Sequence, residues 1–450
     1  MVAMLRAELA KQHGDAERTI QFARQGLALA AADDQYLRYF VGWNLAVGTL
    51  MQGRVEEAEA ALGDLAADPW ATGQHRYFAV RARYTLAQAQ RAQGRLGAAL
   101  RSCQQALELA AEPAGRPPLP AAGVAHVGLA EILYERGELD TAQRHATEGV
   151  ALSRQLAYAQ WLVTGLTALA WIRQAQGDQA DALAAIGEAE QTLPSPDAVS
   201  DLFFPVAVQR IRLLLANGEV AEAARWVGQR ALGATDKPSY GREREYLVLA
   251  RVLLAEQAPE QALGLLRRLH ELAAAQTRVG SVIEIQALQA LALAASGDER
   301  GALAALIQAL LRAAPEGYLR VFVDEGAPMA SLMGRLAAPN QQERVAAAGN
   351  VPPDYLARLV ASFPLAAAHT SQPAGRTVAG SMPGLVEPLS KRELEVLALL
   401  ATGRSNQQIA EELVVALDTV KKHVSRVLDK LGATNRTQAV ARARELELLR

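Results

Sequence analysis

Hydrophobic and polar positions repeat along most of the chain with a period of about 40 residues. A Gly preceded by a polar or small residue is followed five positions later by Ala. From Gly14 to Gly218, successive Gly residues of this pattern are 39, 41, 43, 40 and 41 positions apart. Gly has no Cβ and ends a helix easily, while Ala allows a second helix to pack closely on the first. The Gly–Ala pairs are Gly53 and Ala58, Gly94 and Ala99, Gly137 and Ala142, Gly177 and Ala182, Gly218 and Ala223, and Gly297 and Ala302.

Two further turns complete the pattern. Gly14 fits with Thr19 in the Ala position, and the gap of 79 residues between Gly218 and Gly297 has room for one more turn, at Gln257 with Ala262. One helical hairpin cannot bury its apolar face alone, so consecutive hairpins stack into a solenoid. We therefore predict an all-α fold, with about eight helix pairs over residues 1–313.

The pattern changes after residue 313. Two more helices that cap the solenoid are expected over 314–365, ending near Phe363. Residues 366–387 are rich in Ala, Gly, Pro, Ser and Thr and have no apolar periodicity, which is typical of a flexible linker. A separate small domain of four helices is predicted over 388–450.

Short-range signals define the helices of this last domain. Ser390 with Glu393, and Ser405 with Gln408, have the spacing of a capping box, in which each partner binds a free backbone N–H of the other. A third helix over about 418–431 carries an inward apolar stripe. The stripe consists of Val420, Val424, Val427, Leu428 and Leu431.

Charge separates the last domain from the rest. The chain has a formal net charge of -2, but residues 388–450 hold 11 Lys and Arg against 8 Asp and Glu, a net of +3, and the remainder holds 35 against 40, a net of -5. A local basic surface is what binding to phosphates requires. The last domain is therefore the candidate for nucleic-acid binding.

Other classes of function have no support in the residues. Cys103 is the one cysteine, so no intramolecular disulfide can form, and we interpret it as a buried apolar residue. No spacing typical of catalytic residues, metal ligands or a cofactor site is found, so we expect no enzyme activity, no metal and no cofactor. No signal peptide and no membrane-length apolar run is present, so a soluble cytoplasmic protein is expected.

The 40-residue pattern resembles the tetratricopeptide family in a long-period variant. The segment PEGYLRVFVDEG, at 315–326, resembles the end of the repeat domain in large LuxR-type regulators related to the maltose-regulon activator. Such regulators often carry an ATP-binding domain before the repeats, and no G-x-x-x-x-G-K-[ST] motif is found here. We therefore expect either a shortened relative without that domain or a chain whose start was lost.

The stretches LSKRELEVL, NQQIAEEL and DTVKKHV closely resemble the LuxR-type helix-turn-helix domain. This resemblance implies a bacterial transcription regulator whose third helix enters the major groove of double-stranded DNA, with RNA polymerase as a further partner. It implies that bases contact Lys421, Lys422 and Ser425. Phosphate contacts are expected at Thr419, His423 and Arg426, and with weaker support at Arg404 and Asn406.

The pattern departs from the family in the turn before the third helix. Ala416 and Leu417 stand where the family commonly has a capping Ser or Thr, and Asp418 can compensate through the helix dipole. A single domain of this size makes few contacts, so high affinity is expected to need a homodimer on DNA. Ala439, Ala443 and Leu446 on the fourth helix are the candidate dimer face, and the alternative is that they pack within the domain.

The repeats are predicted to form a curved solenoid whose inner surface binds a small-molecule or protein effector. Aromatic residues recur on the first helices of the pairs, and the alternative is that they belong to the core between repeats. They are Trp43, Tyr84, Tyr134 and Trp171. Because the linker is flexible, the repeats are expected to control DNA binding by masking the last domain or by oligomerisation. A different hypothesis is a protein-interaction scaffold whose last domain docks a partner, and the Lys421–Lys422 pair favours DNA over that reading.

Overall fold

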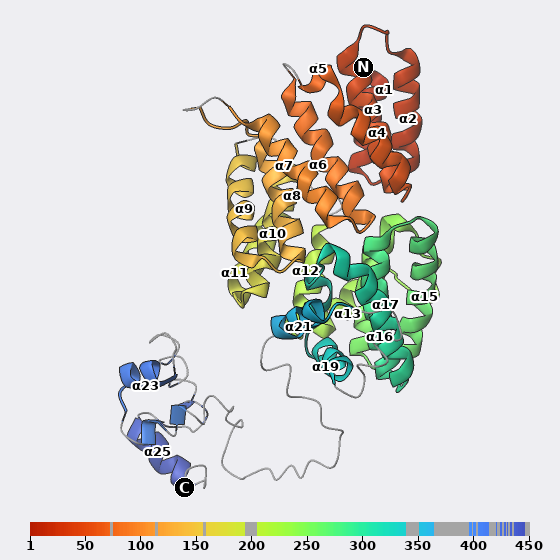
Figure 1. Cartoon of the computed structure of the whole chain (residues 1–450). Coiled ribbons are helices and arrows are strands. Elements are labelled where there is room, and N and C mark those ends of the chain that lie inside the picture. The colour runs from red at the N-terminus through yellow and green to blue at the C-terminus, as the bar shows by residue number, and fades with distance from the viewer. Residues whose placement is uncertain are drawn as a thin grey trace. The chain divides into compact units, whose positions relative to one another are not determined.

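A computed structural model describes most of the chain (Figure 1). The described residues are 1–72, 75–112, 116–155, 159–193, 205–338, 351–363, 396–397, 399–401, 404–413, 420, 424, 427–428, 430, 433 and 436–445. The chain divides into two compact units, Met1–Ser371 and Gln372–Arg450, called here the repeat unit and the terminal unit. The predicted linker at 366–387 lies outside the described residues.

The repeat unit is built from consecutive helix pairs, which confirms the predicted all-α solenoid. The described part of residues 1–313 forms the pairs α1 (Val2–Gln12) with α2 (Ala16–Leu29), α3 (Gln35–Met51) with α4 (Val55–Ala67), α6 (Arg76–Ala92) with α7 (Leu96–Ala110), α8 (Ala122–Glu135) with α9 (Leu139–Ser153), α10 (Ala159–Ala175) with α11 (Gln179–Thr192), α12 (Val206–Ala216) with α13 (Val220–Gln229), α14 (Glu243–Ala255) with α15 (Pro259–Ala275), and α16 (Val279–Ala295) with α17 (Glu299–Ala313).

Shorter helices fill the connections and end the unit. A four-residue helix, α5 (Pro69–Thr72), precedes α6, and a 3-10 turn, η1 (Tyr240–Arg242), precedes α14. After α17 come the 3-10 turn η2 (Ala314–Glu316) and three helices. These are α18 (Arg320–Val323), α19 (Gly326–Ala337) and α21 (Pro353–Ser362).

The predicted turn is present in every pair. All seven turn glycines have φ between 72° and 90°, in the left-handed region, and Gln257 adopts the same conformation with φ 59°. At Gly137, for example, the next amide, that of Glu138, donates to the carbonyl oxygen of Leu133 at 2.9 Å and closes the helix end. The residue five positions after each turn is fully buried against the partner helix, including Thr19 and Ala262.

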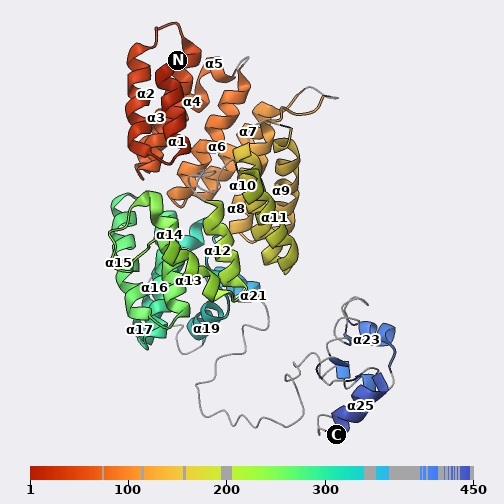
Figure 2. The same cartoon turned by 180° about the vertical axis from the view of Figure 1, so that it is seen from behind.

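The solenoid closes on itself within the repeat unit. Figures 1 and 2 both show the green pairs α14–α15 and α16–α17 next to the first, red pairs. The Gln276 amide donates to the carbonyl oxygen of Gln52 at 3.0 Å. Gly280 allows a close backbone approach, because a Cβ there would lie 2.6 Å from the carbonyl oxygen of Arg91.

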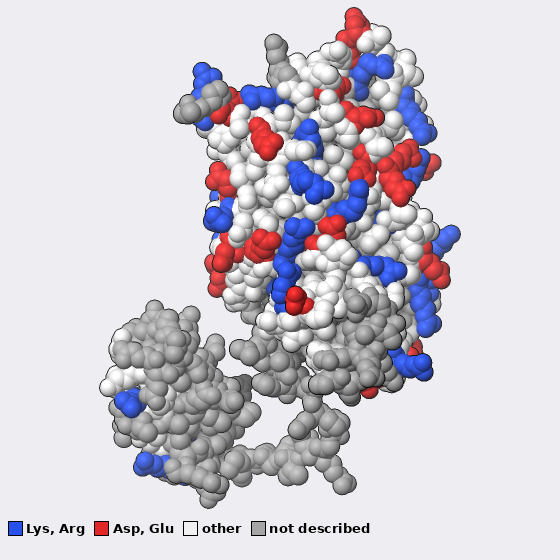
Figure 3. Space-filling model, in the orientation of Figure 1, with Lys and Arg blue, Asp and Glu red and all other residues white. Residues whose placement is uncertain are grey.

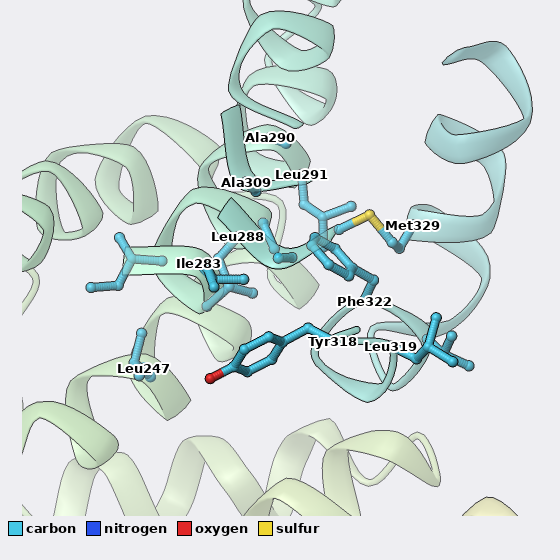
Figure 4. Close-up of a cluster of buried hydrophobic side chains, with 14 of the residues drawn as sticks. Leu247, Ile283, Leu288, Ala290, Leu291, Ala309, Tyr318, Leu319, Phe322 and Met329 are labelled. Carbon is cyan, nitrogen blue, oxygen red and sulfur yellow. The ribbon is translucent and has the colours of Figure 1, made fainter. Parts of the chain in front are cut away.

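Residues after the last pair complete this closure. The backbone amides of Leu319 and Val321 donate to the carbonyl oxygen and the carboxylate of Glu135, each at 2.8 Å. Phe322 and Met329 are fully buried and lie against α16 beside Leu291, as Figure 4 shows. The segment that resembles the end of a regulator's repeat domain therefore joins the eighth pair to the fourth.

Candidate functional site

The terminal unit begins its second helix with the predicted capping box. α23 (Asn406–Leu413) follows Ser405, whose backbone amide donates to Gln408 Oε1 at 2.9 Å. In return the Gln408 amide donates to Ser405 Oγ at 3.3 Å. The prediction for Ser405 and Gln408 is confirmed, while Ser390 and Glu393 lie outside the described residues.

Apolar side chains from several segments form the core of the terminal unit. Val396, Leu400, Ile409 and Val420 pack together, and the partly buried Val424 lies against them. Val427 is also fully buried. The predicted inward stripe of the third helix is therefore confirmed at Val420 and Val427.

The residues expected to contact DNA fall into two groups. Thr419, Lys421, Lys422, His423, Ser425 and Arg426 lie outside the described residues, as do Ala416, Leu417 and Asp418. Arg404 is exposed and Asn406 is partly exposed at the start of α23. The carbonyl oxygen of Arg404 accepts a hydrogen bond from Arg436 Nη2 at 2.7 Å, which ties this helix start to α25 (Arg436–Glu445).

The candidate dimer face is covered by the chain itself where it is described. Ala439 and Ala443 on α25 are both 0% exposed, while Leu446 lies outside the described residues. A side chain buried in its own domain cannot supply contact area to a second copy. This burial agrees with the alternative that the two alanines pack within the domain.

The repeat unit contains a cavity of about 150 Å³ on the inner side of the solenoid. The first helices of consecutive pairs line it, together with the segment around α18. Two of the four aromatic residues named from the sequence, Tyr134 and Trp171, are among the lining residues. Trp43 and Tyr84 are not, and Trp43 is 8% exposed in a separate apolar cluster with Leu50 and Leu86.

Charged residues of the cavity wall are largely paired with one another. Arg91 contacts Glu131 at 2.7 Å, and Glu284 binds both Arg244, at 2.5 Å, and Arg251, at 2.9 Å. Although burial raises the pKa of Glu284, the facing arginines Arg244 and Arg251 hold that pKa well below its usual range. Glu284 is therefore ionised, and both carboxylates are paired with neighbouring arginines.

The acidic residues nearest to α18 behave differently. Asp324 pairs with Arg320 and accepts a hydrogen bond from the Tyr134 hydroxyl. Burial raises the pKa of Glu135 to about 7, although the hydrogen bond from the Val321 amide acts to lower it. Glu135 is thus partly protonated at neutral pH.

Trp171, Gln209 and Arg212 form a third group on this wall. The indole Nε1 of Trp171 on α10 donates to Gln209 Oε1 on α12 at 2.8 Å. The Arg212 guanidinium lies over the Trp171 ring, 4.8 Å from its centre. A planar cation over an indole face is attracted by the electron density of the ring.

Sequence reasoning missed the polar wall of the cavity. Gln209 and Arg212 stand one repeat after Trp171, on the next first helix, and a comparison of repeats offered one signal. Trp43 shows the same arrangement, since its Nε1 donates to Thr85 at 3.2 Å and Arg81 lies over its ring at 3.5 Å. A polar residue and an Arg about 40 positions after a Trp therefore mark this arrangement.

Two general findings concern the described residues. Among them, no group of three or more His, Cys, Asp or Glu side chains is placed to hold a metal ion. None of the described helices combines the length and the apolar character needed to cross a membrane. Cys103 is buried, and burial raises the pKa of its thiol to about 12.

Charge on the visible face of the repeat unit is mixed. Figure 3 shows Lys and Arg interspersed with Asp and Glu over this face, without a broad region of one sign. Such a surface has no stripe of positive charge to follow a nucleic-acid backbone. This face of the repeat unit does not look like a nucleic-acid surface.

Comparison with known protein families matches both units. Residues 1–338 match the model of the MalT-like TPR region. Residues 387–443 match the model of the bacterial regulatory proteins of the luxR family. The chain therefore belongs to the family that has the MalT-like TPR region, and it carries a C-terminal domain of the luxR family of bacterial regulatory proteins.

Proposed function

We propose that the protein is a sequence-specific transcription regulator that reads DNA with the helix at about 418–431 and senses an effector with its repeat unit. The luxR-family match over 387–443 carries the proposal, since it makes the protein a DNA-binding regulator. The burial of Val420 and Val427 supports the choice of helix, because these residues fix its inner face and leave the opposite face for DNA.

Lys421, Lys422 and Ser425 are proposed to contact bases in the major groove. Thr419, His423 and Arg426, together with Arg404 and Asn406, are proposed to contact phosphates. Arg404 is exposed at the start of α23, where the free N–H groups of the helix end also favour an anion. The contacts to bases would give specificity, and those to phosphates would give salt-dependent affinity.

The test replaces Lys421 and Lys422 by Ala in the full chain. The double variant should lose about 1–3 kcal/mol of specific binding for each base contact, or lower the salt slope by about one for each phosphate contact. Binding is measured by fluorescence anisotropy on DNA recovered with the wild-type protein, at several salt concentrations. Lys237→Ala, an exposed Lys of the repeat unit, is the matched control.

Unchanged affinity and salt slope in a folded Lys421→Ala/Lys422→Ala variant would contradict the proposed DNA contacts. Such a result would favour the scaffold hypothesis, in which the last domain docks a protein. Lys237→Ala should keep the wild-type DNA affinity and salt slope, which would show that removing a positive charge elsewhere in the chain does not weaken binding.

A single domain of this size makes few contacts, so we propose that two copies bind half-sites about one helical turn apart, ~34 Å. With Ala439 and Ala443 buried, the contact between copies would have to use other surfaces. RNA polymerase is proposed as a further partner on the luxR-family resemblance. Footprinting at saturating protein should protect two half-sites, and protection of one half-site alone would count against the dimer.

The inner surface of the repeat unit is proposed to bind the effector. The cavity of about 150 Å³ lies there, and it is lined by polar and aromatic side chains from successive first helices. Pockets with a few convergent polar groups among apolar ones are the usual form of small-molecule sites. Binding would alter how available the terminal unit is to DNA.

A further inference from the structure

We propose that the cavity binds a small organic carboxylate, held by the Arg212 guanidinium and the Gln209 amide beside Trp171. This inference rests on the proposed effector role of the repeat unit and names the chemical class of the effector.

The first step is the pairing of charge around the cavity. Glu131 has Arg91, Asp324 has Arg320, and Glu284 has Arg244 and Arg251. Glu325, behind the wall, also pairs with Arg251. Each of these carboxylates is therefore already matched by a cation.

Arg212 is the cation without a match. Within the part of the chain that the structure describes, no hydrogen bond or ion pair to Arg212 is found, and its Nε is buried with no hydrogen-bond partner. Burial and the neighbouring charge of Arg251 lower the pKa of Arg212, and the nearby carboxylates of Glu284, Glu325 and Asp324 offset this only in part. Because this guanidinium lacks a hydrogen-bonded acceptor among the described residues, an anion beside it would gain charge-assisted hydrogen bonds.

Gln209 supplies a second donor beside it. The residue is 2% exposed, its Oε1 is used by Trp171, and its Nε2 is buried without a partner among the described residues. Gln209 and Arg212 are three positions apart on α12, so the two side chains share one face of that helix. Both line the cavity, and both offer only N–H donors to it.

Donors of this kind select a carboxylate. The guanidinium presents parallel N–H groups that match the two oxygens of a carboxylate, and the amide can donate to the same group. Glu135 also lines the cavity, and its pKa of about 7 reduces the repulsion that a fully ionised neighbour would exert on an anion. Trp171 and Ala168 supply apolar wall.

The cavity limits the ligand to a small molecule. A cavity of about 150 Å³ is the size that holds one benzene ring in other proteins. The ligand would therefore be a monoanion with a short chain or a single ring. Benzoate, acetate and propionate sample this class, and benzamide is the uncharged match to benzoate.

The experiment measures the melting temperature of the full chain with each compound, at constant ionic strength set by sodium chloride. At least one of the three carboxylates should raise the Tm of the wild-type protein, while benzamide and inorganic phosphate should not. Arg212→Met should weaken the responding carboxylate at least tenfold by isothermal titration. Arg144→Met, at an exposed position on α9, should leave that binding unchanged.

A second readout does not depend on the choice of probe. Because Arg212→Met removes a charge that has no hydrogen-bonded partner among the described residues and keeps an unbranched side chain beside Trp171, the ligand-free variant should melt at the same temperature as the wild type or higher. A lower Tm would show that Arg212 is structural. No response to any of the three carboxylates, a response to phosphate alone, or an equal response in Arg212→Met would each overturn the proposal.

Failure of this site can be told apart from failure of the effector role. If a carboxylate binds through Arg212 but the DNA affinity of the full chain does not change, the site stands and the effector role fails. If no carboxylate binds, yet cell extract changes the DNA affinity of the wild type and of Arg212→Met alike, the effector role stands and the carboxylate site is wrong.

Discussion

In the repeat unit, residues as distant as Arg91 and Asp324 line one cavity, whereas in the terminal unit the helix start is held by Ser405 and Gln408, three positions apart. The first arrangement depends on the closure of the solenoid, and the second depends on local spacing alone. A DNA-binding domain defined by short-range spacing can therefore occur in the same chain as a repeat unit whose cavity is assembled from long-range contacts.

The largest effect is expected where the repeat unit buries a charged pair. Arg278 is 0% exposed and contacts Glu243 at 2.5 Å, while Ser281 also donates to Glu243 at 2.6 Å. Glu243→Ala leaves the Arg278 charge buried and should cost about 3–5 kcal/mol of the free energy of unfolding. Urea denaturation of the full chain, monitored by circular dichroism, measures this loss in the unfolding transition of the repeat unit.

Glu188→Ala is the control for that prediction. Its pair with Arg154 lies on the surface, where both side chains are about half exposed, so the loss should not exceed about 1 kcal/mol. Equal losses in the two variants would mean that burial does not decide the strength of these pairs. The terminal unit should keep its own transition in both.

The next effect depends on pH. Burial raises the folded pKa of Glu135 from an ordinary 4.5 to about 7, so the folded state holds its proton longer than the unfolded state. The resulting stability is present below pH 4.5 and is lost as the pH rises through 7, by at most about 3 kcal/mol. Glu135→Gln, which keeps an acceptor for the Val321 amide, should be the more stable protein at pH 8.

The measurement is the difference in unfolding free energy between Glu135→Gln and the wild type at pH 5 and pH 8. A difference is used because burial lowers the pKa values of His126, His145 and His270, which changes the pH profile of both proteins alike. A difference that does not grow with pH would contradict the raised pKa of Glu135.

A smaller effect tests the turns of the repeat unit. At Gly218, φ is +86° and no atom lies near an added Cβ, so Gly218→Ala isolates the backbone cost and should destabilise by about 1 kcal/mol. Gln257 already occupies this conformation with a side chain, so Gln257→Gly should be neutral or stabilising. The free energy of unfolding of both variants is measured by equilibrium unfolding in urea. A loss of stability in Gln257→Gly as well as in Gly218→Ala would contradict this explanation of the turn.

An effect of similar size is expected in the terminal unit. Ser405→Ala removes the hydroxyl that accepts the Gln408 amide and should cost about 1 kcal/mol in the unfolding of this unit alone. Ser405→Asp, which keeps a capping acceptor, should recover most of that loss. If Ser405→Ala instead lowers the stability of the repeat unit, the separation of the two units is wrong.

Sequence reasoning predicted what depends on local spacing. The 40-residue period predicts the turn at Gln257, because it leaves a gap between Gly218 and Gly297. The capping box is predicted because Ser405 and Gln408 are three positions apart. The Arg212 environment could not be found in this way, since it depends on contacts between helices whose order in space the period does not encode. Ala439 and Ala443 show another limit, because Ala suits a domain core and a dimer face equally well.

The proposed control of the terminal unit's access to DNA by the repeat unit is tested most directly by one comparison of affinities. Residues 372–450 are fused to a dimerising coiled coil, and their affinity for the recovered DNA is compared with that of the whole chain without effector. The fused terminal unit should bind at least about tenfold more tightly, because masking in the whole chain would leave only a fraction of the molecules competent to bind DNA. Equal affinities, in the presence and absence of cell extract, would contradict control by masking.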